Sequence, residues 1–218
     1  MSSDLGELIN RQVEQKKFRA IENSVDTDLF YYAERNRVND VFRFIHVSSM
    51  NSLKNAEGLL RAFKAFQQAG GKAELVMVGD TTPAIRDYAA SLAFPERSVH
   101  FHGEVSNADV AALMRKADCF VLFSNVENSP CVIGESLCCG VPVIATTVGG
   151  IAELVTEENG VLVEACDETV LAEAMKKMTE DYSKFDRKKI AENALGRFSY
   201  SVIGKKIDDV YQSVLTGK

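Results

Sequence analysis

The sequence predicts an α/β protein with a doubly wound parallel sheet of about six strands flanked by helices. From residue 42 onward, short apolar runs alternate with segments whose apolar residues recur at helical spacing. The run that ends at residue 124 is almost continuously apolar, which is typical of a strand covered by helices on both faces. Hydrophobic residues make up 46% of the 218 residues, which is enough to form one compact core.

Six apolar runs are the expected strands, and the segments between them are the expected helices. We predict strands over 42–48, 73–79, 98–103, 119–124, 142–146 and 160–164. We predict helices near 55–69, 83–92, 106–116, 130–139, 150–155 and 168–180. The alternation of strand and helix at this spacing is typical of consecutive βαβ units.

The two ends of the chain differ from this central region. Residues 1–17 are expected to form a charged helix, and 18–32 a short strand followed by a turn. Apolar residues at helical spacing predict a last helix over 199–215. We therefore divide the chain into an N-terminal part (1–32), a central domain (33–198) and a C-terminal helix (199–218).

Composition and charge narrow the classes of function. The 25 basic residues are outnumbered by 31 acidic ones, and the net charge of -6 argues against a nucleic-acid partner. The N-terminal segment does not resemble a signal sequence, and no run approaches the ~20 apolar residues needed to cross a bilayer. The cysteines lack disulfide or metal-binding spacing and indicate reduced thiols in a cytoplasmic protein: Cys119, Cys131, Cys138, Cys139 and Cys166.

The loops that follow the strands are where a parallel sheet of this kind binds ligands. In the loop "NVENSP", Ser129 is a candidate N-cap and Pro130 fits the first position of the next helix. The free amides at such a helix start form an anion site, most naturally for phosphate. The first loop, "VSSMNSLKN", carries Lys54, whose ammonium group can neutralise a phosphate.

Two glutamates stand close to this predicted anion site. Glu127 would repel a phosphate unless its carboxylate faces a hydroxyl-rich part of the ligand. Glu135 lies eight residues later on the predicted helix, where an ionised carboxylate can accept both hydroxyls of a ribose. Phosphate, ribose and sugar together describe a nucleotide sugar. The alternative is that Glu135 is a surface residue or an ion-pair partner on an amphipathic helix.

A resemblance to a known family adds to this interpretation. "ENSPCVIGE", followed directly by "LCCGVPVIATTVGGIAELV", resembles the E-x(7)-E motif of the family 4 retaining glycosyltransferases, which have the GT-B fold. "AIENSVDTDLF" resembles the family's "NGVD" segment, where the chain crosses between two domains, and "LKNAEGLLRAF" resembles its lysine-bearing helix. The resemblance covers roughly residues 20 to 215 and implies a Rossmann-like domain, one half of a GT-B enzyme.

The resemblance implies roles for individual residues. Glu135 resembles the glutamate that binds the donor ribose, and Glu127 the one that contacts the donor sugar near its reacting carbon. Lys54 matches the lysine that binds the diphosphate, so Lys54 and Glu127 are the expected catalytic residues. The other expected donor-binding residues are Ser49, Gly79, Asp80, Phe101, His102, Asn128, Ser129, Pro130, Cys131 and Val132.

Two positions depart from the family pattern. Many members have an arginine five residues before the lysine, and this chain has Ser49 there. Binding of the diphosphate is therefore expected to depend more on Lys54 and on the helix amides. Ser24 replaces the glycine of "NGVD", which concerns the local backbone rather than the chemistry.

The resemblance also implies the substrate and the partners. The donor would be a UDP- or GDP-sugar, with no cofactor and no metal. The chain looks like the donor half alone, because the N-terminal acceptor-binding half of the family is missing, and we expect it to be inactive without that half. The basic stretch "KFDRKK" (184–189) is expected to be a solvated helix face, with peripheral contact at the inner face of the membrane as the alternative.

Other functions are compatible with parts of the same sequence. The chain could be a non-catalytic nucleotide-sugar-binding module, or half of a GT-B-like sugar-nucleotide 2-epimerase. An NAD-dependent oxidoreductase is disfavoured because no G-x-G-x-x-G follows the first strand. "DTD" (26–28) resembles a metal motif but follows no apolar strand. His46 and His100 are expected to be packing residues, whereas His102 at a strand end remains a candidate for the donor site.

Overall fold

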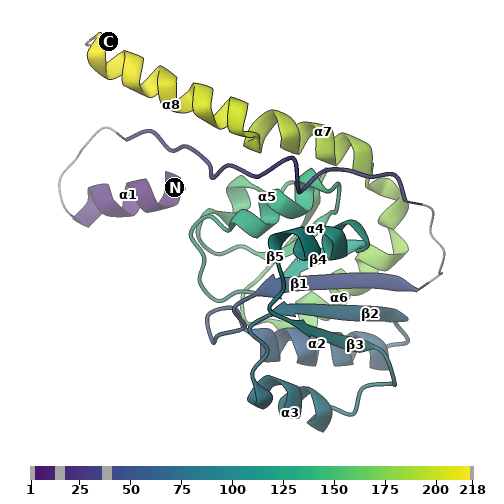
Figure 1. Ribbon diagram of the computed structural model, residues 1–218. Helices are drawn as coiled ribbons and strands as arrows, with labels where there is room; N and C mark the ends of the chain where they lie inside the picture. The colour runs from purple at the N-terminus through teal and green to yellow at the C-terminus, as the bar shows by residue number, and fades with distance from the viewer. Residues whose placement is uncertain (1–2, 13–17, 36–40, 217–218) are drawn as a thin grey trace.

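The computed structural model describes residues 3–12, 18–35 and 41–216, and its centre is a six-stranded parallel sheet (Figure 1). The strand order is β3-β2-β1-β4-β5-β6, which confirms the predicted doubly wound fold. Each predicted strand is present, with its ends within two residues of the prediction. The strands are β1 (Phe42–Ser48), β2 (Ala73–Gly79), β3 (Val99–Gly103), β4 (Cys119–Leu122), β5 (Val143–Thr146) and β6 (Gly160–Val163).

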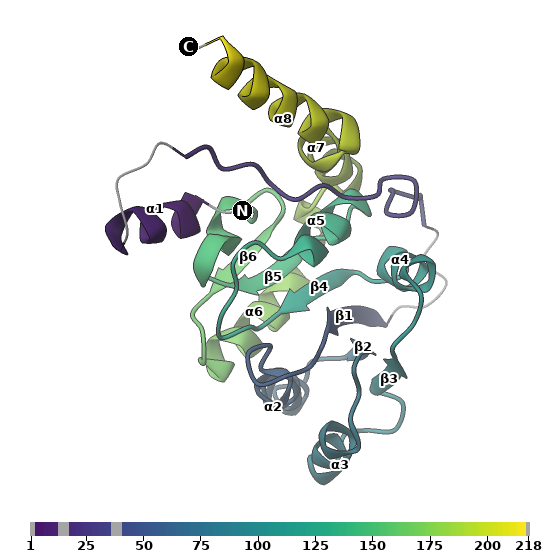
Figure 2. The ribbon, with the colours of Figure 1, turned by 60° about the vertical axis from the view of Figure 1, so that its left-hand side comes forward.

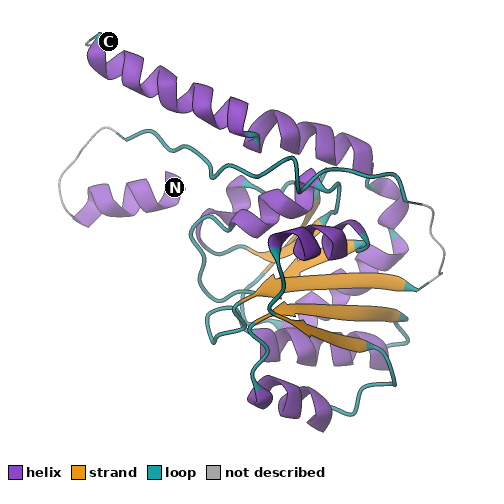
Figure 3. Ribbon diagram, in the orientation of Figure 1, coloured by secondary structure: helices purple, strands orange, loops and turns teal. Residues whose placement is uncertain are grey.

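Helices cover both faces of the sheet (Figure 3). A hydrophobic core lies on each face of the sheet. Neighbouring residues of β1 contribute to both cores: Phe44 packs against one layer of helices and Ile45 against the other, and both are fully buried. One layer contains α2 (Ala56–Gln68), α3 (Pro83–Ser91) and α6 (Glu168–Glu180). The other contains α4 (Asn107–Arg115), α5 (Cys131–Cys138) and α7 (Arg187–Phe198). The predicted helix at 150–155 is a short 3-10 helix, η1 (Gly149–Glu153).

The chain reverses its direction of winding between β1 and β4. From β1 it proceeds outward through β2 to β3, and from β4 it proceeds outward through β5 to β6. The ladder between β1 and β2 is long, running from the pair Phe42–Ala73 to the pair Ser48–Gly79. The ladder between β1 and β4 ends at the pair of Ile45 and Phe120. The two central strands therefore separate toward their carboxyl ends, where such sheets bind ligands.

Residues 18–35 of the N-terminal part run over the layer that contains α4, α5 and α7 (Figure 1). Helix α1 (Ser3–Gln12) confirms part of the predicted helix, and 13–17 lie outside the described residues. The strand predicted within 18–32 is wrong: Val25 makes only an isolated bridge to Ser199, because this segment runs over helices and has no strand beside it. The predicted turn is confirmed, and Asp26 uses its carboxylate to accept the amide of Asp28 at 3.1 Å.

The C-terminal part adds two consecutive helices, α7 and α8 (Tyr200–Leu215), joined at Ser199. The last predicted helix is confirmed, and it runs beyond the sheet (Figure 2). The sequence predicts a helix here only over 184–189, so most of α7 was not predicted. Its buried positions include two alanines, Ala191 and Ala194, which give a weak periodic signal. No helix in the described ranges is long and apolar enough to cross a membrane.

Candidate functional site

The loop between β1 and α2 holds Lys54 just before the helix. The side-chain oxygen of Asn51 accepts the amides of Leu53 at 3.0 Å and Lys54 at 3.2 Å. Asn55 is the N-cap of α2, with a φ of 49°, and its side chain accepts the amide of Gly58 at 3.2 Å. These local bonds are typical of asparagine in turns and caps, and they fix the backbone from which Lys54 projects.

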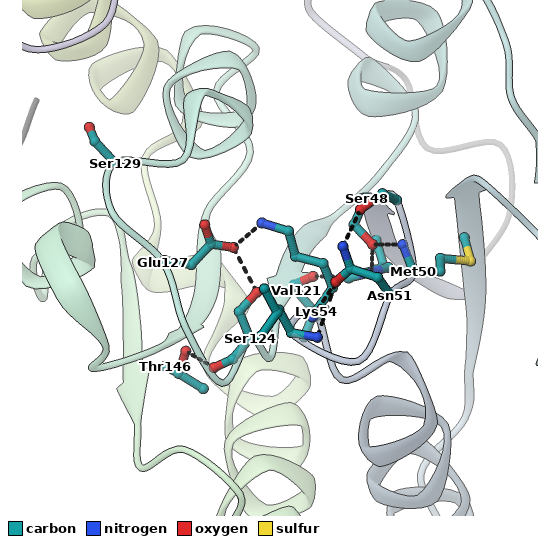
Figure 4. A network of polar contacts seen from close by, with 12 residues as sticks. Ser48, Met50, Asn51, Lys54, Val121, Ser124, Glu127, Ser129 and Thr146 are labelled. Atoms are coloured by element: carbon teal, nitrogen blue, oxygen red, sulfur yellow. Dashed lines mark hydrogen bonds and ion pairs between the residues drawn. The ribbon is translucent and has the colours of Figure 1, made fainter.

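Lys54 contacts Glu127, which lies on the loop that follows β4 (Figure 4). The Lys54 Nζ donates to Glu127 Oε1 at 2.6 Å, and the Ser124 hydroxyl donates to the same oxygen at 2.7 Å. The Ser124 carbonyl in turn accepts the hydroxyl of Thr146, at the end of β5, at 2.8 Å. The side chain of Glu127 is 7% exposed and that of Lys54 25%. The structure thus brings the two expected catalytic residues together at the point where β1 and β4 separate.

A pair of glycines supports the loop that carries Glu127. The amide of Gly150 donates to the carbonyl of Asn128 at 2.9 Å. Gly149 has a φ of 55°, and a Cβ there would lie 1.9 Å from the carbonyl oxygen of Glu127. Only glycine fits this approach of the two backbones. The "GG" that follows β5 is therefore required for the position of Glu127.

Two other segments hold the same loop from its sides. Asn125 donates its amide to the carbonyl of Leu53 at 2.8 Å and its side chain to the carbonyl of Ser52 at 3.1 Å. Asn23, in the N-terminal part, donates its side chain to the carbonyl of Ser129 at 2.9 Å. The loop thus touches both the Lys54 loop and the segment that resembles the interdomain crossing.

Helix α5 begins later than predicted. Pro130 is the N-cap residue, with a φ of -69° and a ψ of 117°, and no side-chain hydrogen bond caps the helix. The predictions of Ser129 as the N-cap and of Pro130 as the first helical residue are therefore wrong, because the backbone of Pro130 is still extended. The amides of Cys131 and Val132 have no acceptor within the described residues, as expected for the first turn of a helix. They remain available to an anion.

Glu135 lies on α5 and is half-buried. No hydrogen bond or ion pair joins its carboxylate to another described residue, so the ion-pair alternative finds no support here. Burial raises the pKa of this carboxyl above its ordinary value of 4.5, because the charged form has lost part of its water. Glu135 is thus a partly dehydrated carboxylate that needs hydrogen-bond donors.

The remaining predicted residues lie at the ends of β1, β2 and β3. Gly79 has a φ of 124°, and a Cβ there would lie 1.8 Å from the Ser48 carbonyl oxygen, so β2 can end beside β1 only with glycine. Asp80, directly after it, is exposed. Ser49 accepts the side-chain amide of Asn51 at 3.1 Å and so has a local structural contact.

Phe101 and His102 project to opposite faces of β3. The Phe101 ring lies 5.2 Å from the guanidinium carbon of Arg86, on α3. The His102 side chain lines a hollow on the opposite face with Arg43, Glu74 and other residues. The structure therefore does not bring either side chain to the cluster of Lys54 and Glu127.

Several residues that shape this site were not predicted from the sequence. Ser124 had a usable signal, because it is the first polar residue at the end of an apolar run in a parallel strand. His46, treated as a packing residue, is fully buried but hydrogen-bonded at both ring nitrogens. Asn23 had no local signal, because its partner Ser129 is 106 residues away. No disulfide joins the five cysteines, all of which lie within the described residues, and burial raises the pKa values of Cys138 and Cys139 to about 12.

Other hollows of the surface lie away from this cluster. One of about 660 Å³ runs along β6 and the end of α6, and one of about 330 Å³ lies beside α7. Neither is lined by Lys54, Glu127 or Glu135.

The chain matches the family model described as Glycosyl transferases group 1 over residues 31–197. It is 29% identical over 175 residues to N-acetyl-alpha-D-glucosaminyl L-malate synthase of Bacillus anthracis, covering 78% of this chain and 45% of that protein. It is 28% identical over 175 residues to the GDP-mannose-dependent monoacylated alpha-(1-6)-phosphatidylinositol monomannoside mannosyltransferase of Corynebacterium glutamicum, covering 73% and 44%. The chain spans about half the length of the curated relatives it matches.

Solved structures show the same fold. Sucrose-phosphate synthase from Thermosynechococcus elongatus superposes with a TM-score of 0.86 at 23% identity, covering 100% of this chain and 58% of that one. Anabaena HepE in complex with UDP-glucose has a TM-score of 0.73 at 25% identity, covering 89% and 57%. The family model includes Lys54 and both glutamates of the site. Since it covers most of the sequence, the chain belongs to the glycosyl transferases group 1 family.

Proposed function

We propose that this chain binds the UDP- or GDP-sugar donor of a retaining, metal-independent glycosyltransferase. The observation that carries the proposal is the placement of Lys54 against Glu127 on two loops at the switch point of the sheet. Family membership and the solved structures of Anabaena HepE with bound UDP or UDP-glucose support it.

The diphosphate would lie between Lys54 and the start of α5. A lysine ammonium has three N–H donors, and one of them is used by Glu127, so two are left for phosphate oxygens. The free amides of Cys131 and Val132 would receive the distal phosphate, aided by the positive end of the helix dipole. No arginine accompanies Lys54 at position 49, so these amides are the second source of donors.

The two carboxylates would receive hydroxyl groups of the donor. Glu135 has no partner among the described residues and would accept the two ribose hydroxyls. Glu127 Oε1 is occupied by Lys54 and Ser124, whereas Oε2 receives no hydrogen bond from a described residue. Oε2 would therefore accept a hydroxyl of the donor sugar close to the diphosphate.

In the transfer step, the bond between the anomeric carbon and the diphosphate oxygen would break as the acceptor oxygen bonds to that carbon, and the proton of the acceptor hydroxyl would pass to an oxygen of the departing diphosphate. The leaving diphosphate gains negative charge, which Lys54 and the α5 amides would stabilise in place. The acceptor hydroxyl must be held about 3–3.5 Å from the reacting carbon. We propose that a second, acceptor-binding half provides this and that the chain alone is inactive. Its length relative to the curated relatives supports this proposal.

The peripheral membrane contact through 184–189 receives less support from the structure. Lys184 pairs with Asp181 at 2.8 Å, and Lys189 lies 3.6 Å from Glu158. Acidic neighbours of this kind reduce the attraction of lysines to an anionic lipid surface. Several relatives are named mannosyltransferase or glycosyltransferase, which favours a transferase over the epimerase and the non-catalytic module.

Two measurements on residues 1–218 test the proposed function. Calorimetry should detect binding of UDP or GDP, and a product assay with UDP- and GDP-sugars should detect no glycosylated acceptor. Binding of neither nucleotide would remove the donor-binding role. Glycosylation of an acceptor by this chain alone would contradict the need for a second half.

A further inference from the structure

His46 lies where the central strands separate. Beyond the pair of Ile45 and Phe120, the ladder between β1 and β4 ends, and His46 is the next residue of β1. Its side chain is fully buried. The ring Nδ1 lies 2.9 Å from the carbonyl oxygen of Val121, on β4. The imidazole therefore joins β1 to β4 one position beyond the last backbone pair.

The partners of the ring define its protonation. The Val121 carbonyl can only accept, so Nδ1 carries the proton and donates it. The pKa of His46 is lowered to about 4, mainly by burial; the positive charge of Lys54 acts in the same direction, whereas the Val121 hydrogen bond and Glu127 act in the opposite one. In the neutral ring Nε2 is an acceptor, so the Ser48 hydroxyl donates to it at 2.7 Å.

Ser48 continues this connection into the Lys54 loop (Figure 4). Its oxygen accepts the amide of Met50 at 2.9 Å. Met50 has a φ of 50°, an uncommon conformation for a side chain of this size, so the turn needs such support. Asn51 follows directly and holds the amide of Lys54.

The other end of the connection leads to Glu127. Val121 lies on β4, and the chain then continues through Ser124, whose hydroxyl holds the Glu127 carboxylate. A single buried ring thus joins the bases of the two loops that carry Lys54 and Glu127. A packing residue of the same size would fill the space but would not fix the two loops relative to each other.

We propose that His46 is a positioning residue, whose neutral imidazole bridges Val121 and Ser48 and so places Lys54 for the donor diphosphate. This inference rests on the proposed function. It requires that loss of the bridge weakens recognition of the phosphates specifically, while contacts to the nucleoside remain.

The test compares binding of a nucleoside with that of its diphosphate by residues 1–218. The ratio of the Kd for uridine to that for UDP, or for guanosine to GDP, isolates the contribution of the phosphates. His46→Asn and Ser48→Ala each break the link between ring and hydroxyl, and each should reduce this ratio about 3- to 10-fold. Ser48→Thr keeps a hydroxyl and should restore the ratio.

Ile45→Val is the matched control for stability. Ile45 is buried beside His46 but takes no part in the bridge, so this variant should lower Tm and leave the ratio unchanged. An unchanged ratio in both His46→Asn and Ser48→Ala, with a parent chain that binds UDP or GDP, would overturn the inference.

Nitrogen NMR of the His46 ring provides a test that needs no nucleotide. The ring should carry its proton on Nδ1 and remain neutral from pH 7 down to pH 5, consistent with a pKa of about 4. Ser48→Ala should shift the Nε2 signal. A proton on Nε2, or a charged ring at pH 6, would overturn the bridge even if the chain binds no nucleotide.

Discussion

Glu127 and Glu135 are eight residues apart, yet their carboxylates differ in whether the protein supplies them with hydrogen-bond donors. Glu127, on the loop after β4, is 7% exposed and already accepts Lys54 and Ser124. Glu135, on α5, is half-buried, and no bond within the described residues satisfies it. Burial raises the pKa of Glu135 through loss of water. The protein itself holds one carboxylate in place, whereas the hydrogen bonds of the other would come from the proposed donor.

This difference suggests that the two carboxylates have different roles within the proposed donor site. A group that must meet changing charge during a reaction works best when it is preorganised. A group that binds an unchanging part of the ligand can obtain its hydrogen bonds from that ligand. The loop with Glu127 and Lys54 fits the first description, and α5 with Glu135 fits the second.

The largest effect is expected from Lys54→Ala. Removal of one preorganised donor typically lowers turnover ~10²–10³-fold, so transfer by an enzyme that joins this chain to an acceptor-binding half should fall by that order. Binding of UDP or GDP to residues 1–218 should weaken as well, since a charge-assisted bond is lost. Steady-state kinetics and calorimetry measure the two effects. Lys72→Ala is the control, because Lys72 is exposed and away from the site. Equal activity of parent and Lys54→Ala would remove Lys54 from the mechanism.

The next largest effects are expected from substitution of the two glutamates, and they should differ in kind. Glu135→Ala should weaken binding of nucleoside and nucleoside diphosphate alike, by on the order of 10-fold, because the ribose is present in both. Glu127→Ala should leave nucleoside binding almost unchanged and mainly lower kcat with the sugar donor. Calorimetry with uridine and UDP, or guanosine and GDP, beside transfer kinetics distinguishes the two. If Glu135→Ala binds both ligands as tightly as the parent, the ribose assignment is wrong.

The positions of these glutamates could be predicted from the sequence, but the difference between their surroundings could not. Apolar runs and helical periods predicted the six strands and most helices, because each is a local pattern. The motifs placed Lys54 and Glu127 on loops and Glu135 on a helix, as the structure has them. It did not predict that Glu127 is paired and Glu135 is not, because pairing depends on contacts such as that between Lys54 and Glu127, 73 residues apart.

The errors have specific physical causes. The start of α5 was placed one residue early because proline is common at the first helical position, whereas here Pro130 remains extended. Helix α7 was largely missed because alanines at its buried positions gave a weak pattern. The role of His46 could not be read from its apolar neighbours, since Val121 is 75 residues away.

The smallest expected effect concerns the stability of the ligand-free chain, and it should differ in sign between the two glutamates. The pKa of Glu135 is raised in the folded state, so the folded chain holds that proton more tightly than the unfolded chain. Stability therefore falls as the pH rises from the ordinary value of 4.5 through the raised pKa. Glu135→Gln removes this loss and should raise Tm at pH 7, and the difference from the parent should vanish below pH 4.5.

Glu127→Gln should have the opposite effect at pH 7. It removes the charge that faces Lys54, in a pair whose glutamate is 7% exposed, and should lower Tm by a few degrees. Thermal unfolding of both variants and the parent at pH 4 and pH 7 measures the contrast. The control is Glu96→Gln, because the Glu96 side chain is 91% exposed and its loss should leave Tm almost unchanged. If Glu135→Gln lowers Tm at pH 7 as Glu127→Gln does, Glu135 has a stabilising partner in the free chain, and the contrast between the two carboxylates is wrong.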